Sequence, residues 1–431
     1  MGDAAGARGD VRLAHALPSP PDRAADASTL RAHNLGIVMR LLREHGTVSR
    51  KDIEQASGMV PASVLNLLGD LESRGLVREV RHGAAGEVRG RGRPRVMVEA
   101  VGDRCLALAV RVTRERITSE LHSSTGVLLD SASRAVAFKW GNPDAAVAAV
   151  ADLVARALAT AADRGGLLMA VVVAMPGPVG KDNTLADSVE FGWGHVGLEA
   201  RLREAGTPDS VRVEVVNEGD VAGLAEYWEL PSPRPSVMLF LNGDRMIGGG
   251  VVQDGRVLVG AHGFGGALGH VTVDWRGRSC ECGSIGCLNA YIGAEALLTS
   301  ARLIDHVQMR GTVAAMLELQ ERLDRGERRA VDVAIRAGDI LGAAMRSVYD
   351  VVNPAALVLG GHLAWMRRWL EPGVQMQLAT RTERLAPVRI TTARLGSRAG
   401  LVGAARYGLE VLFDDPTVVP VLEDAPARLL G

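Results

Sequence analysis

The chain has 431 residues, of which 47% are hydrophobic and 23% charged, and its net charge is −1. This length predicts two or three folded units with an ample core. No apolar run approaches the ~20 residues that span a membrane. The first 28 residues lack the apolar segment of a secretory signal. The four cysteines suit a reducing compartment, so we expect a cytoplasmic protein without a membrane partner.

The charge is distributed unevenly along the chain. Residues 29–98 contain 12 Arg and Lys against 7 Asp and Glu and therefore carry +5, which leaves −6 for the remainder. A basic first unit on an acidic body is typical of nucleic-acid-binding proteins.

Three short helices are expected near the N-terminus. Apolar residues recur at helical spacing over 30–45. Ser49 is a suitable N-cap for a helix over 50–57, and Pro61 fits the first turn of a third helix over 61–75. This arrangement predicts a helix-turn-helix whose third helix enters the DNA major groove.

The segment 77–99 has two short apolar stretches around a Gly- and Arg-rich loop, as a β-wing has. Arginines in such a loop can follow phosphates or enter a narrow minor groove. Most arginine runs are solvated linkers, but the adjoining helix-turn-helix favours DNA contact. The expected DNA contacts are Ser49, Arg50, Ala62, Ser63, Asn66, Arg89, Arg91 and Arg93.

From residue 104 onward, apolar strands alternate with helical patterns, which predicts an α/β body. The expected strands lie at 105–112, 116–122, 168–175, 211–216, 237–242, 248–259 and 356–361. The expected helices lie at 142–164, at about 217–224, over much of 294–351, and from about 398 onward. We expect disordered tails at 1–28 and 414–431, a winged helix-turn-helix at 29–98, and a two-lobed body at 99–413.

Three of the four cysteines lie close together at Cys280, Cys282 and Cys287, ten positions after His270. Thiolate and imidazole are the ligands that a tetrahedral structural zinc prefers. The spacing is too tight for mutual disulfides without strain, and the loop contains two glycines that suit a tight turn. Buried free cysteines are the alternative. The clustering beside a histidine favours a structural Zn²⁺ held by these four residues.

Several motifs together resemble the ROK family, and in particular its repressor branch with an N-terminal winged helix-turn-helix. The resemblance extends from Leu30 to Leu412. Its most specific part is the Gly-His pair with the CxCGxxGC knuckle. The other matching stretches are Gly92-Arg93-Pro94, Pro176-Gly177-Pro178-Val179, Gly192-Trp193, Asn353-Pro354, Gly360-Gly361, Leu395-Gly396 and Gly403-Ala404-Ala405.

The resemblance implies an actin-like/ribonuclease-H-like body of two lobes with a sugar cleft between them, preceded by an all-α winged helix-turn-helix. It implies that Asn217, Glu218 and His270 contact an effector. It also implies that the zinc histidine faces this ligand, which would couple the metal to the effector site.

Three departures argue against the sugar-kinase activity of other family members. Arg111 stands where the first phosphate loop of kinases has an acidic residue, and Asp244-Arg245-Met246 replaces the second loop. Glu218 corresponds to the catalytic aspartate, and its extra methylene displaces the base. We therefore expect no enzyme.

The sugar-binding set also departs from the family pattern. Ala267 and Asn289 stand where glutamates usually bind sugar hydroxyls, which should weaken or redirect binding. Arg111 and Arg245 would place positive charge near the cleft and would suit a phosphorylated or acidic effector.

The sequence thus favours a DNA-binding transcriptional regulator, a repressor, that responds to a sugar or sugar phosphate. The alternatives are a sugar kinase with an accessory DNA-binding unit and an effector-independent regulator with a vestigial cleft. We expect a homodimer or homotetramer on operator DNA, because pseudo-palindromic operators match two-fold protein symmetry.

Overall fold

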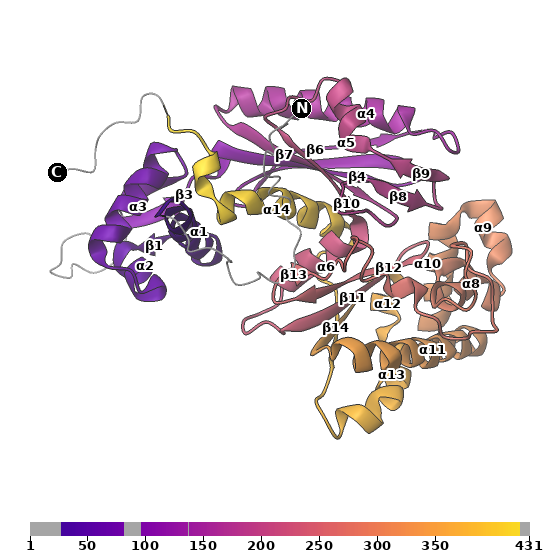
Figure 1. Cartoon of the computed structure of the whole chain (residues 1–431). Coiled ribbons are helices and arrows are strands. Elements are labelled where there is room, and N and C mark those ends of the chain that lie inside the picture. Colours follow the sequence, from indigo (N-terminus) through magenta and orange to yellow (C-terminus); the bar gives the residue numbers. More distant parts are fainter. Residues whose placement is uncertain (1–26, 82–95, 137, 423–431) are drawn as a thin grey trace, which may run out of the picture.

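The computed structural model describes residues 27–81, 96–136 and 138–422. These residues form a small head and two larger lobes, with the head attached beside the first lobe (Figure 1). The body is mixed α/β, as the alternation of strands and helices predicts.

The head contains the three predicted helices and a small antiparallel sheet of order β1-β3-β2. Strands β2 and β3 flank residues 82–95, as the predicted wing requires. The head therefore contains a sheet, and the expectation of an all-α head is wrong for this part of it. Arg89, Arg91 and Arg93 lie outside the described residues. The elements are α1 Ala27–His45, β1 Val48–Ser49, α2 Arg50–Ser57, α3 Pro61–Ser73, β2 Val77–Arg81 and β3 Val96–Ala100.

Local signals explain where the head helices begin and end. Ser49 and Asp52 form a reciprocal capping box at the start of α2, which satisfies backbone N–H groups that the helix leaves free. Gly58 ends α2 in the left-handed conformation, at φ +72°. Pro61 occupies the first turn of α3, where its missing N–H costs nothing.

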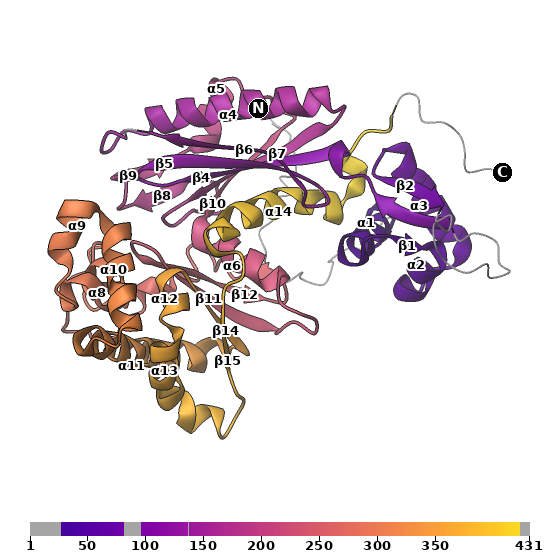
Figure 2. The same ribbon diagram turned by 180° about the vertical axis from the view of Figure 1, so that it is seen from behind.

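The first lobe contains a five-stranded sheet of order β10-β7-β4-β5-β6. Strands β10, β7 and β4 run parallel, whereas β5 and β6 are antiparallel to their neighbours. Helices α4 and α5 cover one face of this sheet (Figure 2). The elements are β4 Cys105–Val112, β5 Arg116–Ser123, β6 Leu128–Ala135, α4 Asp144–Asp163, β7 Leu167–Met175, β8 Leu185–Ser188, β9 Trp193–Val196, α5 Leu198–Glu204 and β10 Arg212–Asn217.

Among the described residues, α4 is long and apolar enough to cross a membrane. Its apolar face is instead buried in the lobe: Ala146, Val150 and Val154 belong to the same hydrophobic core as the sheet residues Val171 and Val173. The helix therefore forms a layer of the first lobe, as core helices of similar composition do.

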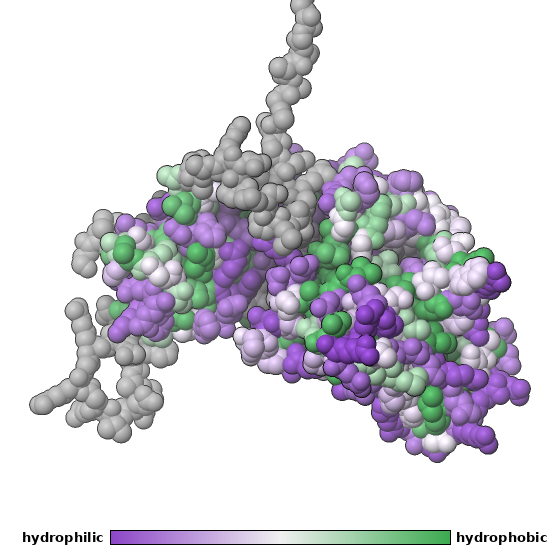
Figure 3. Space-filling view, turned by 60° about the horizontal axis from the view of Figure 1, so that its bottom comes forward, coloured by the Kyte–Doolittle hydropathy of each residue, from purple (hydrophilic) through white to green (hydrophobic). Residues whose placement is uncertain are grey.

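The second lobe is built on another five-stranded sheet, of order β13-β12-β11-β14-β15, with helices packed against it. Apolar and polar side chains are interspersed over the face that Figure 3 presents. The elements are β11 Val237–Gly243, β12 Ile247–Gln253, β13 Arg256–Val257, α7 Asn289–Ile292, α8 Ala294–Ser300, α9 Ile304–Arg310, α10 Thr312–Asp324, α11 Arg328–Val352, β14 Ala356–Gly360, α12 Gly361–Trp365, α13 Arg367–Thr382 and β15 Arg389–Thr392.

The two lobes repeat one topology, because both sheets have the same strand order and the same parallel and antiparallel neighbours. The helix after the last strand of each lobe crosses to the sheet of the other lobe. Thus α6 (Glu218–Trp228) packs on β11 and β12, whereas α14 (Ala399–Asp414) packs on β4 and β7. Figure 1 shows both helices between the two sheets.

Glycines allow α14 to approach its neighbours closely. A Cβ at Gly403 would lie 1.9 Å from the carbonyl oxygen of Val221 on α6, and one at Gly408 would lie 2.8 Å from a methyl carbon of Val172 on β7. Both distances are shorter than van der Waals contact, so neither position has space for a larger side chain without backbone movement.

The residues after α14 pack against the head, although the sequence places them in a tail. A short 3₁₀ turn at Pro416–Val418 follows the helix. The Arg74 guanidinium at the end of α3 donates to the carbonyl oxygens of Thr417 (3.1 Å) and Val419 (2.5 Å). The Leu422 N–H donates to Ser73 O at 2.8 Å. The C-terminal segment up to Leu422 therefore joins the body to α3.

Replacing Gly403 by alanine should destabilise the protein, because the new methyl group would overlap the Val221 carbonyl. The expected loss is about 1–3 kcal/mol of unfolding free energy, the usual cost of overpacking. Thermal or urea unfolding measures it. Gly69→Ala in α3 is the control, because a Cβ at Gly69 would meet no atom within 4 Å beyond its own helix backbone, so helix propensity should make it neutral or stabilising. Equal effects of the two changes would contradict the close-packing argument.

Candidate functional site

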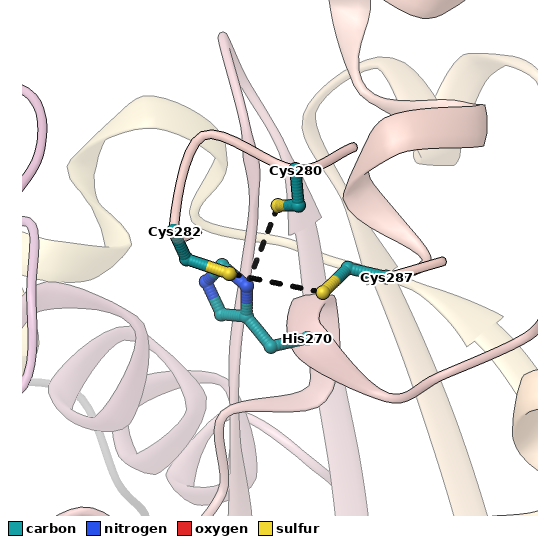
Figure 4. Close-up of side chains that lie close together, drawn as sticks. All are labelled: His270, Cys280, Cys282 and Cys287. Atoms are coloured by element: carbon teal, nitrogen blue, oxygen red, sulfur yellow. Dashed lines mark hydrogen bonds between the residues drawn. The ribbon is translucent and has the colours of Figure 1, made fainter. Parts of the chain in front are cut away.

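Four side chains converge at one edge of the second lobe. Ligand atoms of His270, Cys280, Cys282 and Cys287 all lie within 4.8 Å of one another (Figure 4). The His270 Nδ1 is 3.8 Å from the Cys280 sulfur, and the Cys282 and Cys287 sulfurs are also 3.8 Å apart. The structure thus brings together the four residues that the sequence nominates as ligands.

Backbone turns hold this knuckle. The Cys280 N–H donates to Ser284 O at 2.8 Å, and the Gly283 N–H donates to Cys280 O at 3.0 Å. Gly283 and Gly286 have φ values of +86° and +79°, which favour glycine. A tetrahedral Zn²⁺ with zinc–sulfur bonds of about 2.3 Å places two sulfurs about 3.8 Å apart, so the ligand set fits a metal of this kind.

A cleft of about 720 Å³ lies beside the knuckle, between the two lobes. His270 and Cys282 line it together with residues of both lobes, so the cluster and the cleft share a wall. Asn217 and Glu218, at the start of α6, also line the cleft. All three sequence-nominated effector residues therefore face one cavity.

An ion-pair cluster joins the two lobes across the cleft. The Arg111 Nε at the end of β4 lies 2.6 Å from a Glu218 carboxylate oxygen, and its Nη2 lies 3.2 Å from Asp244 Oδ2 in the turn between β11 and β12. Burial raises the pKa of Glu218, and the Arg111 charge partly offsets that rise. The Glu218 carboxylate is therefore already paired with the Arg111 guanidinium.

Arg245 is also paired rather than free. Its guanidinium donates to both carboxylate oxygens of Glu281 in the knuckle, at 3.0 and 2.9 Å. Arg111 and Arg245 both line the cleft, as expected, but each is paired with a carboxylate, so the acidic or phosphorylated effector that they were expected to suit stays an untested prediction.

Asn217 is largely committed to the fold. Its Oδ1 accepts from the N–H groups of Gly219 (2.8 Å) and Asp220 (3.2 Å) and so caps α6, while its Nδ2 donates to Gly177 O at 2.7 Å. One of the two amide N–H groups remains for a ligand. Asn289 likewise has a structural contact, because its Oδ1 accepts from the Ile247 N–H at 2.9 Å.

Two carboxylates of the cleft were missed by the sequence reasoning. Asp187 at the end of β8 and Glu190 in the turn after it both line the cavity. Burial raises the pKa of Glu190. No motif marks these residues, because only the packing of β8 against the first sheet carries them to the cleft.

The head residues nominated for DNA contact fall into two groups. Ala62, Ser63 and Asn66 are exposed on α3, opposite its buried apolar face. Ser49 is buried, and its hydroxyl donates to Asp52 Oδ2 at 2.7 Å. The Arg50 guanidinium pairs with Glu79 on β2. The last two side chains already have partners within the head.

Asp220, in the first turn of α6, is a buried carboxyl in the wall of the cleft. Its side chain packs against a glycine strand, and a Cβ at Gly250 would lie 2.9 Å from its Oδ1. Burial raises the pKa of Asp220 to about 8. The carboxyl is therefore mainly protonated at neutral pH.

Asp220→Asn should flatten the pH dependence of stability. The folded-state pKa lies above the unfolded value near 4, so stability from this group is complete below pH 4 and declines up to about pH 8. The decline is at most about 1.4 kcal/mol per pH unit. Urea unfolding at pH 5 to 8 should show a steeper fall for the unmodified protein than for Asp220→Asn. Exposed Asp209→Asn is the control; a slope unchanged in Asp220→Asn would refute the assignment.

Proteins of known family are similar to this chain. The ROK family profile matches residues 123–410. The chain is 25% identical over 363 residues to the DNA-binding transcriptional dual regulator NagC of Escherichia coli (strain K12), covering 80% of this chain and 84% of that protein. It is 31% identical over 269 residues to the kanosamine kinase of Amycolatopsis mediterranei (strain S699), covering 62% and 86%.

A solved structure extends the similarity to the whole architecture. The crystal structure of a ROK family transcriptional regulator, a homologue of the E. coli MLC protein, has a TM-score of 0.73 and 24% identity, covering 90% of this chain and 97% of that one. The fold therefore includes both lobes and the head. With two thirds of its residues matched by the family profile, the chain belongs to the ROK family.

Proposed function

We propose that this protein is a DNA-binding transcriptional repressor whose affinity for operator DNA is controlled by a sugar or sugar-derived effector in the interlobe cleft. The observation that carries the proposal is the exposed face of α3, which presents Ala62, Ser63 and Asn66 on a helix-turn-helix. Small polar side chains on such a helix suit hydrogen bonding to base edges. The similarity to NagC, itself a DNA-binding regulator, supports the same reading.

Helix α14 supplies a physical connection between cleft and head. At its first turn, a Cβ on Gly400 would lie 3.1 Å from the Glu218 Cγ. At its last turn, Phe413 O approaches α1 so closely that a Cβ on Gly36 would lie 2.3 Å away. A ligand that binds two lobe arrangements with different affinity therefore acts on the helix that holds the head.

Charged contacts reinforce the head end of this connection. Arg40 on α1 pairs with Asp414, and Arg43 pairs with Glu410 at 2.5 Å. The Arg43 guanidinium also lies 4.0 Å from the centre of the Phe413 ring. Movement of α14 relative to the lobes would consequently shift or release α1.

Phosphoryl transfer is not part of this proposal. A kinase needs a free carboxylate base and open backbone loops around the phosphates. In this cleft Glu218 contacts Arg111, and Asp244 adds a negative side chain where phosphates would lie. Hexose-dependent ATP hydrolysis by the purified protein would overturn this reading.

The open cleft favours an effector over a vestigial body. A cavity of about 720 Å³ lies within the range of roughly 300–1,000 Å³ typical of small-molecule sites. His270 and the free Asn217 N–H supply polar contacts for hydroxyl groups on the knuckle side. We assign the protein to the cytoplasm and to a homodimer or homotetramer, because paired heads match the symmetry of operators.

We also propose that His270, Cys280, Cys282 and Cys287 hold a structural Zn²⁺. A bound ion would hold the loop of the knuckle in place, and through the Glu281–Arg245 pair it would stabilise the adjoining turn of the second lobe. Metal and effector would then be coupled through the shared wall of the cleft.

Asn66→Ala and Ser63→Ala should each weaken specific DNA binding by about tenfold or more, since a base contact contributes ~1–3 kcal/mol. Gel shifts would use a duplex selected from a random library, with and without a sugar panel. Gln375→Ala, an exposed amide on α13, is the matched control and should bind as the unmodified protein does. Absence of duplex binding at low salt would reject the proposed function. Binding that no sugar alters would favour the effector-independent alternative.

Cys280→Ser should abolish stoichiometric zinc, because three ligands bind the ion far more weakly than four. Elemental analysis of the purified protein should find one zinc per chain, and Cys105→Ser should retain it, because Cys105 is buried in β4, outside the cluster. Purified protein without zinc, even when supplied with the metal, would contradict the assignment.

A further inference from the structure

One end of the cleft is apolar. Helix α10 presents a stripe at helical spacing, with Val313 73% exposed and Leu317 55% exposed, although both line the cavity. Met316 and Trp365 also line the cavity. Exposed apolar side chains grouped in a concave site indicate a binding surface, because a ligand that covers them gains the free energy of apolar burial.

The cavity lining also includes His362, whose buried Nδ1 has no hydrogen-bond partner among the described residues. The His362 side chain lines the cavity, and its Nε2 lies 3.0 Å from Ile292 O. Burial lowers the pKa of His362 to about 4, so the ring is neutral and Nε2 carries the proton. Nδ1 is a buried atom that meets the geometry of no hydrogen bond in the described part of the chain, and the ring lies directly against the backbone of Gly243.

The charges of the cleft disfavour a phosphorylated occupant. Its described lining has six carboxyl residues and four arginines. The two innermost arginines are paired with Glu218 and Glu281, Arg116 donates to Ser133, and Arg114 lies over the Trp140 ring. A phosphate would meet Asp244 and Glu190. Arg114 and Arg116 are the only lining arginines without a carboxylate partner among the described residues, so carboxyl groups outnumber the unpaired cations of the cleft.

We propose that the effector is an uncharged glycoside, with its sugar at the knuckle end of the cleft and an apolar, preferably aromatic, aglycone against α10 and Trp365. This inference rests on the proposed function and names the ligand class of that site. The volume of about 720 Å³ accommodates both parts in one cavity.

Calorimetry on the full chain would compare methyl and 4-nitrophenyl β-glycosides of glucose, xylose, mannose and N-acetylglucosamine as matched pairs. For the sugar that fits, we expect the aryl member to bind about tenfold more tightly, because its ring buries apolar surface on α10. Leu317→Asn should bring the two affinities close together and leave the methyl glycoside unaffected. Met376→Asn is the matched control, because Met376 is exposed on α13 and is absent from the cavity lining.

Equal affinity within every pair, or an aryl preference that survives Leu317→Asn, would overturn the inference. Failure of both members of every pair to bind would overturn it as well. Gel shifts with the same compounds separate it from the proposed function. If methyl glycosides release DNA as well as aryl glycosides do, the proposed regulatory function is supported and the proposed aglycone site is rejected. If the protein prefers aryl glycosides but does not bind DNA, the proposed regulatory function is rejected and the proposed ligand class is supported.

Discussion

The contact between α14 and α6 is the constraint on which the rest of the structure depends. Each helix follows the last strand of one lobe and covers the sheet of the other lobe. Each lobe thus contributes one helix to the other, in addition to the chain segments that link them. The exchange needs Gly403 against the Val221 carbonyl. Because interiors are close-packed, small displacements there move whole elements instead of being absorbed. Helices α14 and α6 therefore connect the cleft residue Glu218 with helix α1 of the head through close contacts.

The charges of the cleft follow from the same geometry. Arg111 ends a strand of the first lobe, and Asp244 lies in a turn of the second, so their contact depends on how the lobes meet. Glu218 is held between them at the start of α6. A guanidinium enclosed by two carboxylates binds both strongly and leaves little charge for a ligand. This pairing is one reason for proposing an uncharged glycoside as the effector of the proposed regulator.

Several elements of the fold and the cysteine knuckle could be predicted, because the sequence signals that specify them lie within a few residues of one another. The capping box at Ser49, the proline at position 61 and the apolar spacing of α3 determine the head helices within a few residues of chain. The knuckle is local too, because its three cysteines lie within eight positions and turn on two glycines. The central strands of both lobes were recognisable as apolar runs, whereas the exposed strand β6 and the short strands β8, β9 and β15 were not predicted. The order of motifs indicated the ROK fold.

The amino-acid sequence by itself determined the helices of the head, the α/β character of the body and the clustering of three cysteines with His270, because each depends on neighbours in the chain. Only the tertiary structure decided the partners of the polar side chains. Asn217 donates to the Gly177 carbonyl, Arg50 pairs with Glu79, and the segment after Asp414 packs on α3. Hydrogen bonds and ion pairs join residues that are remote in sequence, so a residue type at a position does not reveal which partner occupies it.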